Sequence, residues 1–272
     1  MTRHVLMCEP LHFRIAYEIN PWMRRTNAVE GPRALAQWRA LRDVLDRVGV
    51  NIEFVQQGAA VPDMTFTANA GLALGRRFIP ANFRHVERQP ESALFSDWFR
   101  ARGYEVHHLD AAASWEGEGD VLPAGDTIFA GYGFRTDQPA LDELEPLLDR
   151  PLVRLELTDP RFYHLDTCFC PLGEGRAMYY PPAFSAAGRA VLARHIEDLI
   201  AVPDGEALRF ACNAVLVDNA VVLNTGTPET QAALRSRGFE VHATPMEEFL
   251  KAGGSVKCLV LTLGGFTPRS VA

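Results

Sequence analysis

The chain contains 272 residues, of which 47% are hydrophobic and 22% charged, as expected of a folded protein rather than a disordered one. A formal net charge of −7 and the lack of any Lys/Arg-rich run argue against a nucleic-acid partner, while a small cationic substrate is compatible with this charge. We also expect no membrane partner, because no apolar run reaches the roughly 18 residues of a membrane span.

The cysteines and the N-terminus indicate the cellular compartment. Five cysteines, at positions 8, 168, 170, 212 and 258, are an odd number without the spacing of a disulfide framework. The first residues run directly into a strand-like segment with no signal-peptide pattern. We therefore expect reduced thiols and a cytoplasmic location.

The first part of the chain predicts a strand, a helix, a second strand and a hairpin. Residues 4–8 have a strand pattern, and apolar residues recur at helical spacing over 32–48 until Gly49. A β-rich run follows at 51–55. A polar loop then reaches 66–69, and the next two apolar runs, 72–74 and 78–79, predict a hairpin.

The order helix, strand, polar loop and hairpin recurs along the rest of the chain. Helices are expected at 92–102, 139–148, 187–200 and 228–237, the last with Thr227 as N-cap and Pro228 as its first residue. Strands are expected at 104–109, 152–157, 201–202 and 239–243, and hairpins within 121–129, 168–180 and 215–223.

Five polar residues mark the corresponding loop of each unit. Asn69, Asp120, Asp166, Asn213 and Cys258 lie 51, 46, 47 and 45 residues apart, a period typical of ring or array architectures. Without polar cap repeats an open solenoid is disfavoured, so we predict an α/β ring of five ββαβ units, the N-terminal strand completing the last. Since no linker is evident, residues 1–272 are expected to form a single domain whose marked loops meet at a common axis.

Cys258 follows a tight turn at Gly253-Gly254 and begins a short β-type run. A thiol on a rigid strand beside such a turn fits a nucleophile, although a lone cysteine is more commonly a small core residue. The decision between these interpretations depends on partners elsewhere in the chain.

His164 and Asp166 are the first candidate partners. On an extended backbone, residues two apart share a face, so both would enter one cavity while Tyr163 and Leu165 face the other way. A satisfied structural pair is the commoner role of a His-x-Asp sequence. The position of this pair at a marked loop favours the site.

The segment 115–120 supplies three carboxylates, Glu116, Glu118 and Asp120, interleaved with glycine. It is either a solvated acidic loop or a backbone that turns a carboxylate inward, and spacing alone does not separate Glu116 from Glu118. Neither calcium nor zinc fits well, because the EF-hand pattern is missing and Cys168-x-Cys170 lacks the usual zinc spacing. We expect no metal.

Arg88 and Arg135 follow successive hairpins at corresponding places and could clamp a carboxylate bidentately. A thiolate, an imidazole and carboxylates in one cavity suit attack on a carbon flanked by cationic nitrogen. A papain-like protease is disfavoured, because its cysteine precedes its histidine.

Over essentially its whole length the chain resembles the guanidino-group modifying enzymes of pentein fold, five-bladed α/β propellers that include arginine deiminases, dimethylarginine dimethylaminohydrolases and amidinotransferases. Within that superfamily it is most similar to the hydrolase domain of arginine dihydrolases, which is sometimes fused to an ornithine cyclodeaminase. The stretches that carry the resemblance are INPWM (19–23), PDMTFTANAG (62–71), FRHVERQ (83–89), EGEGD (116–120), FYHLDTCFCP (162–171), FACNAV (210–215) and FLKAGGSVKC (249–258).

The resemblance implies roles for individual residues. It implies Cys258 as nucleophile, His164 as general acid/base and Glu116, rather than Glu118, as the carboxylate that holds the guanidinium. The substrate-binding residues that it implies are Asp166 for the guanidinium, Arg88 and Arg135 for the substrate carboxylate, Asp63 for the amino end or guanidinium, and Asn69, Asn20 and Phe66 in the matched loops. It implies no cofactor.

Asn69 bears on the extent of the reaction. Deiminases and methylarginine hydrolases have an aspartate there, whereas dihydrolases have an asparagine, which with the Asn20 loop goes with accepting neutral citrulline. The expected function is therefore arginine dihydrolase, giving ornithine, two ammonia and CO₂ through a covalent thiouronium. Alternatives that stop at citrulline are dimethylarginine dimethylaminohydrolase and arginine deiminase. An amidinotransferase is less consistent with this site, because it must exclude water from the intermediate. The alternative from another class is a non-enzymatic binding module on the same ring. The expected partner is a small guanidino molecule, and the sequence leaves a homo-oligomer open.

Overall fold

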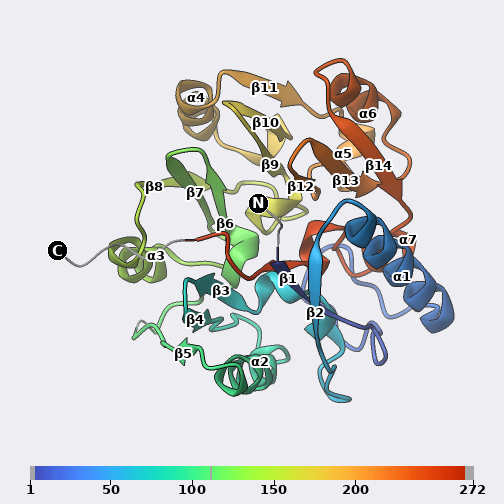
Figure 1. Cartoon of the computed structure of the whole chain (residues 1–272), viewed down its shortest axis with the longest axis vertical. Coiled ribbons are helices and arrows are strands. Elements are labelled where there is room, and N and C mark those ends of the chain that lie inside the picture. Colours follow the sequence, from blue (N-terminus) through green and yellow to red (C-terminus); the bar gives the residue numbers. More distant parts are fainter. Residues whose placement is uncertain (1–3, 111, 267–272) are drawn as a thin grey trace.

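The computed structural model describes residues 4–110 and 112–266, which form five three-stranded sheets around a common centre (Figure 1). The strands are β1 (His4–Cys8), β2 (Asn51–Val55), β3 (Gly71–Leu74), β4 (Arg77–Pro80), β5 (Glu105–Val106), β6 (Val121–Ala124), β7 (Thr127–Tyr132), β8 (Leu152–Glu156), β9 (Phe169–Gly173), β10 (Arg176–Tyr179), β11 (Asp198–Ala201), β12 (Val215–Val217), β13 (Ala220–Asn224), β14 (Glu240–Thr244) and β15 (Leu261–Thr262).

Each sheet repeats one connection. An antiparallel hairpin, such as β3–β4 or β6–β7, is followed by a helical crossover to a third strand that lies parallel to the second hairpin strand. The fifth sheet joins the two ends of the chain, since β15 pairs antiparallel with β1 and β1 pairs parallel with β2. The ring of five ββαβ units, completed by the N-terminal strand, is confirmed.

The helices are α1 (Gly31–Arg47), α2 (Gln89–Ala101), α3 (Gln138–Leu144), α4 (Ala186–His195), α5 (Asp204–Ala207), α6 (Pro228–Arg235) and α7 (Glu247–Leu250). Those that connect the second and third strands of a sheet, α1, α2, α3, α4 and α6, lie on the outside of the ring (Figure 1). A proline in the first turn helps to start α1, α2, α3 and α6. The helix α1 buries one face at helical spacing, including Trp38, Leu41 and Leu45, as the sequence predicts.

Several element boundaries differ from the prediction. The helix expected at 187–200 ends at His195, because Asp198–Ala201 pair with β10 as the third strand of their sheet. Pro146 has no amide hydrogen, so the helix expected at 139–148 ends at Leu144 and continues as a short 3₁₀ turn. The strand expected at 104–109 pairs only over β5.

Thr227 lies at the N-cap position of α6 but does not cap it. Its hydroxyl donates to the Asn224 carbonyl oxygen at 3.0 Å instead of accepting a bond from the first turn. The carboxylate of Glu206 accepts the free amide N–H groups of Glu229 and Thr230, at 2.7 and 2.8 Å, and so satisfies this turn.

Four of the five marked loops meet at the axis as short 3₁₀ turns, η2 (Thr67–Asn69), η3 (Gly117–Asp120), η5 (Leu165–Thr167) and η7 (Lys257–Leu259), and the fifth, which contains Asn213, is a bend between α5 and β12. Cys258 therefore lies in a 3₁₀ turn ahead of β15, and its predicted place on a strand is wrong. The loops are tied to one another by side chains: Asn69 donates to the Glu116 carbonyl oxygen at 3.3 Å, and Asp120 accepts the Leu165 amide at 2.9 Å.

Within the two described ranges, no helix has the length and apolarity that crossing a membrane requires.

The links around the axis predict a stability effect. Asp120 is buried and accepts both the Leu165 amide and the Thr136 hydroxyl, at 2.9 and 2.7 Å. Asp120→Ala leaves both donors unsatisfied and is expected to lower the free energy of unfolding by about 2 to 4 kcal/mol in urea denaturation. The matched control is Asp126→Ala, in the exposed β6–β7 turn, with an expected change within about 0.5 kcal/mol. Equal free energies of unfolding of the two variants would contradict the stabilising role of Asp120.

Candidate active site

A buried ion pair between Glu116 and Arg135 lies at the centre of the site. The carboxylate Oε2 of Glu116 is 3.0 Å from the Arg135 guanidinium and 2.8 Å from His164 Nε2. Burial opposes the charge on Glu116, but Arg135 and the hydrogen bond with His164 outweigh it and hold the pKa of this carboxyl well below its usual range. The structure therefore presents an ionised carboxylate inside the protein.

Gly117 allows Glu116 to turn inward. Its φ is +76°, and a Cβ there would lie 2.7 Å from the Gly71 amide nitrogen, so the loops η2 and η3 approach each other as only glycine permits. Of the two interpretations of the acidic segment that the sequence left open, the structure has the inward turn, because Glu116, Glu118 and Asp120 are all buried.

His164 lies between Glu116 and Asn69. With Nε2 donating to Glu116, its Nδ1 accepts from the Asn69 amide at 3.4 Å, and these two partners fix the tautomer. Burial lowers the pKa of His164 to about 4, although the Glu116 carboxylate opposes this shift. The imidazole is therefore neutral at pH 7.

Cys258 is held by a different set of partners. Its Sγ lies 3.1 Å from Asn213 Nδ2 and 3.7 Å from Asp166 Oδ2. Burial and the neighbouring Asp166 raise the pKa of this thiol, and burial raises the pKa of Asp166 to about 7 despite the nearby Lys257 ammonium. The thiol and one carboxylate thus face each other in a desolvated space.

The other wall of the site contains Asp63, Asn69 and Arg88. Arg88 pairs with Glu91 at 2.8 and 2.9 Å and donates to Asn69 Oδ1 at 3.1 Å. Asp63 is buried, burial raises its pKa, and its Oδ1 has no hydrogen-bond partner among the residues of 4–110 and 112–266. The Tyr17 hydroxyl acts on this carboxyl and opposes part of the rise in its pKa. Asp63 also lines the cavity, where its carboxyl can accept a bond from a ligand.

The segment that connects β1 with α1 covers the site through Asn20. The Asn20 amide donates to the Ala252 carbonyl oxygen at 3.0 Å, and Arg135 donates to the Ile19 carbonyl oxygen at 3.0 Å. Gly253, at φ +82°, lets this segment approach, because a Cβ there would lie 2.9 Å from Trp22 Cδ1 and 3.1 Å from Asn20 Oδ1. The enclosed space is only about 10 Å³.

Seven of the ten predicted site residues line this one cavity: Asn20, Asp63, Phe66, Asn69, Arg88, Arg135 and Cys258. The remaining three, Glu116, His164 and Asp166, contact residues of that set. The ten residues therefore lie together at the axis, and their individual roles stay predictions.

Tyr163 contradicts the prediction. It was expected to face away from His164 and Asp166, but it lines the cavity and donates to the Gly253 carbonyl oxygen at 2.7 Å. Its ring also stacks against Arg135, whose Cζ lies 4.6 Å from the ring centre. The alternation fails because His164 is extended while Asp166 lies in the 3₁₀ turn η5. Asn213 was missed as a site residue, although its place one period after Asp166 was a signal.

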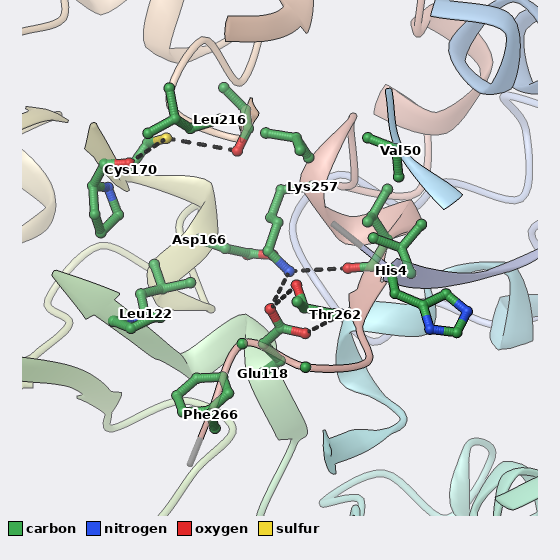
Figure 2. A pocket seen from close by; sticks show the side chains of 18 of the residues that line it. His4, Val50, Glu118, Leu122, Asp166, Cys170, Leu216, Lys257, Thr262 and Phe266 are labelled. Carbon is green, nitrogen blue, oxygen red and sulfur yellow. Dashed lines mark hydrogen bonds and ion pairs between the residues drawn. The ribbon is translucent and has the colours of Figure 1, made fainter. Parts of the chain in front are cut away.

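Glu118 faces a second, larger cavity of about 400 Å³ behind Asp166 (Figure 2). Its carboxylate accepts the amide and hydroxyl of Thr262, both at 2.7 Å, and pairs with Lys257 at 3.2 Å. Glu116 and Glu118, which spacing did not separate, therefore face different spaces, and only Glu116 contacts His164.

The cysteines other than Cys258 are buried and unbridged. Cys168 points its sulfur toward the Leu165 carbonyl oxygen, at 3.6 Å, within the hydrophobic core. Over the described parts of the chain, no three His, Cys, Asp or Glu side chains are grouped so as to hold a metal ion.

Comparison with known proteins places this site in a family. Residues 15–264 match the model of the family described as N,N dimethylarginine dimethylhydrolase, eukaryotic. The chain is 42% identical over 94% of its length to the bifunctional arginine dihydrolase/ornithine cyclodeaminase ArgZ of Synechocystis sp., of which it spans only 37%. It is 41% identical to the N(G),N(G)-dimethylarginine dimethylaminohydrolase of Mycobacterium tuberculosis, over 96% of this chain and 86% of that protein.

Solved structures agree with the sequence comparisons. The crystal structure of the N-terminal domain of ArgZ, bound to product, superimposes with a TM-score of 0.92 at 41% identity, over 97% of this chain and 98% of that domain. A dimethylarginine dimethylaminohydrolase shares the fold at 21% identity, with a TM-score of 0.81. The chain therefore belongs to the dimethylarginine dimethylaminohydrolase family of pentein-fold proteins.

Proposed function

We propose that this protein is a metal-free cysteine hydrolase that converts free L-arginine to ornithine, two ammonia and CO₂. The observation that carries this proposal is the convergence of Cys258, Asp166, His164 and Glu116 around one buried site. A nucleophile flanked by carboxylates suits a substrate whose reacting carbon bears positive charge. The dihydrolase activity named for ArgZ and its product-bound domain structure support this assignment.

We assign the substrate contacts by charge. Asp166 and Glu116 would hold the guanidinium, and the unpartnered oxygen of Asp63 would accept a bond from the α-amino group. Arg88 and Arg135, both buried against the same cavity, would bind the α-carboxylate. Arginine does not fit into about 10 Å³, so the segment that contains Asn20 has to move when substrate enters.

The proposed reaction begins when the guanidinium lies between Asp166 and Cys258. Its positive charge lowers the pKa of the thiol, and the thiol proton passes to His164. The thiolate attacks the guanidinium carbon, and the nitrogen that leaves as ammonia takes the proton from His164. Water then attacks the thiouronium carbon and gives a proton to His164. As the carbon–sulfur bond breaks, the remaining hydroxyl proton of the adduct passes to the Cys258 sulfur, the carbonyl of citrulline forms, and His164 loses its proton to solvent.

A second round at the ureido carbon of citrulline would release the second ammonia and CO₂ and leave ornithine. Citrulline is neutral at this end, so a less anionic pocket penalises it less. Asn69 is an amide that contacts both His164 and Arg88, at 3.4 and 3.1 Å, at a position where an aspartate would add a negative charge.

The second candidate activity is dimethylarginine hydrolysis, which the family match and the Mycobacterium tuberculosis relative favour. An arginine deiminase would likewise stop at citrulline. We place the protein in the cytoplasm, where its unbridged thiols stay reduced.

Product identification tests the proposed function. Incubation with arginine, dimethylarginine and agmatine in turn is expected to give ornithine and two ammonia per arginine. Cys258→Ser lacks the nucleophile and is expected to abolish arginine-dependent ammonia release. Citrulline that accumulates from arginine would contradict the dihydrolase, dimethylamine would favour the second candidate, and full activity of Cys258→Ser would overturn the enzyme mechanism.

Asn69→Asp tests the extent of the reaction. The added charge is expected to penalise citrulline, so chromatography should show citrulline accumulating from arginine where the unmodified protein forms ornithine. Asn82→Asp, an exposed asparagine with the same chemical change, is the control and should leave the product unchanged. Unaltered ornithine formation by Asn69→Asp would refute this reading of the asparagine.

The pH dependence of kcat/KM tests Asp166. Its pKa is raised to about 7, so the carboxyl loses its charge as the pH falls below that value and with it the attraction for a guanidinium. We expect kcat/KM for arginine to fall below about pH 7. Asp166→Asn should raise KM about 10-fold or more and remove this acidic limb. If kcat/KM of Asp166→Asn fell at the same acidic pH, the fall would come from the titration of a group other than Asp166.

A further inference from the structure

We propose that Asn213 is a further catalytic residue, whose side-chain amide donates a hydrogen bond to the Cys258 sulfur and stabilises the thiolate that attacks the substrate. The attack on a substrate rests on the proposed function, whereas the hydrogen bond to the thiol can be tested without any substrate. Asn213 lies in the fourth unit of the ring, between β11 and β12, and is completely buried.

The side chain of Asn213 forms hydrogen bonds with two atoms of Cys258. Its Nδ2 lies 3.1 Å from Sγ, and its Oδ1 accepts the Cys258 amide N–H at 3.1 Å. One carboxamide thus holds both the backbone and the sulfur of the nucleophile in position.

The orientation of this amide follows from its partners. Nδ2 also donates to the Asp166 carbonyl oxygen at 3.1 Å, and Oδ1 faces the N–H of Cys258. A flipped amide would place an oxygen against that carbonyl oxygen and an NH₂ group against that N–H. The NH₂ group is therefore the one that points at the sulfur.

The backbone around Asn213 is also fixed. Its amide donates to the Phe210 carbonyl oxygen at 2.9 Å, and its own carbonyl oxygen accepts the Lys257 amide at 3.3 Å. Phe210 adopts φ +55°, a conformation that is uncommon for a residue with a side chain and persists only where the surroundings hold it. The turn that presents Asn213 is thus maintained by the core.

The charges around the sulfur explain why a donor is needed. Asp166 faces Sγ at 3.7 Å and opposes a thiolate, whereas Lys257, on the same turn as Cys258, favours one. Across the cavity lie Asp63, Arg88 and Arg135. Burial and Asp166 raise the pKa of Cys258, and the hydrogen bonds from the Ser255 backbone and from the Asn213 side chain act against that rise. The amide offers stabilisation without a second net charge.

A purely structural role for Asn213 makes a different prediction. An amide that only joined two segments would, when removed, lower stability and leave the titration of Cys258 unchanged. Asn224 is a control of this kind, because it is equally buried and bridges two backbone segments, accepting the Met246 amide at 3.1 Å and donating to the Arg209 carbonyl oxygen at 2.9 Å.

The experiment measures iodoacetamide alkylation of Cys258 against pH, without arginine, by mass spectrometry of the peptide. Asn213→Ala and Asn213→Asp are expected to move the thiol pKa upward and to slow alkylation below that pKa by about 10-fold or more, because a hydrogen bond to a charged group is lost. Asn213→Asp should be slower still, since it adds a negative charge. With arginine, kcat should fall while KM changes by less than about twofold, since the contacts of Asn213 are to Cys258, Asp166 and backbone.

Asn224→Ala should melt at a lower temperature and keep the alkylation profile of the unmodified protein. Folded Asn213 variants with that same unmodified profile would overturn the proposal. Should neither variant fold, the side-chain NH₂ resonances of Asn213 in the unmodified protein decide it, since they must shift with the titration of Cys258. Failure of the unmodified protein to release ammonia from arginine would refute the proposed function alone and leave the alkylation result standing.

Discussion

The site depends on a carboxylate that stays ionised although it is completely buried. Glu116 retains its charge because Arg135 pairs with it at 3.0 Å and His164 bonds it at 2.8 Å. Breaking such a pair leaves one uncompensated charge in the interior and costs about 3 to 5 kcal/mol. The same carboxylate fixes the tautomer of His164, and Arg135, held by this pair, stacks on Tyr163.

The ring explains how residues far apart in sequence share one site. Each unit brings a short turn to the axis, so Asn69, Glu116, Asp166, Asn213 and Cys258 come from five different units. Side chains and backbone of successive turns then bind one another, as when Asn213 holds Cys258 and Asp120 holds the Leu165 amide. Fold stability and site geometry are therefore set by the same buried bonds.

Much of this arrangement could be predicted from the sequence, because a regular spacing of polar residues together with recurring helix and strand patterns specifies repeated units. The predictions that were wrong concerned local side-chain directions. The alternation assumed for 163–166 ignored that a 3₁₀ turn changes the side-chain direction, so Tyr163 was placed on the wrong side. The separation of Glu116 from Glu118 needs the approach of η2 and η3, which no spacing reveals. Asn213 was recognised as the marked residue of its loop but was given no role, because an amide has no distinctive motif and only its contact with Sγ shows its relevance.

The most direct test of this account is acid quenching of the protein during turnover of arginine, followed by peptide mass spectrometry. We expect an adduct on Cys258 whose mass equals that of arginine less ammonia, while Cys8, Cys168, Cys170 and Cys212 stay unmodified. Ammonia release with no adduct on Cys258 at any quench time, or with the adduct on another residue, would contradict it.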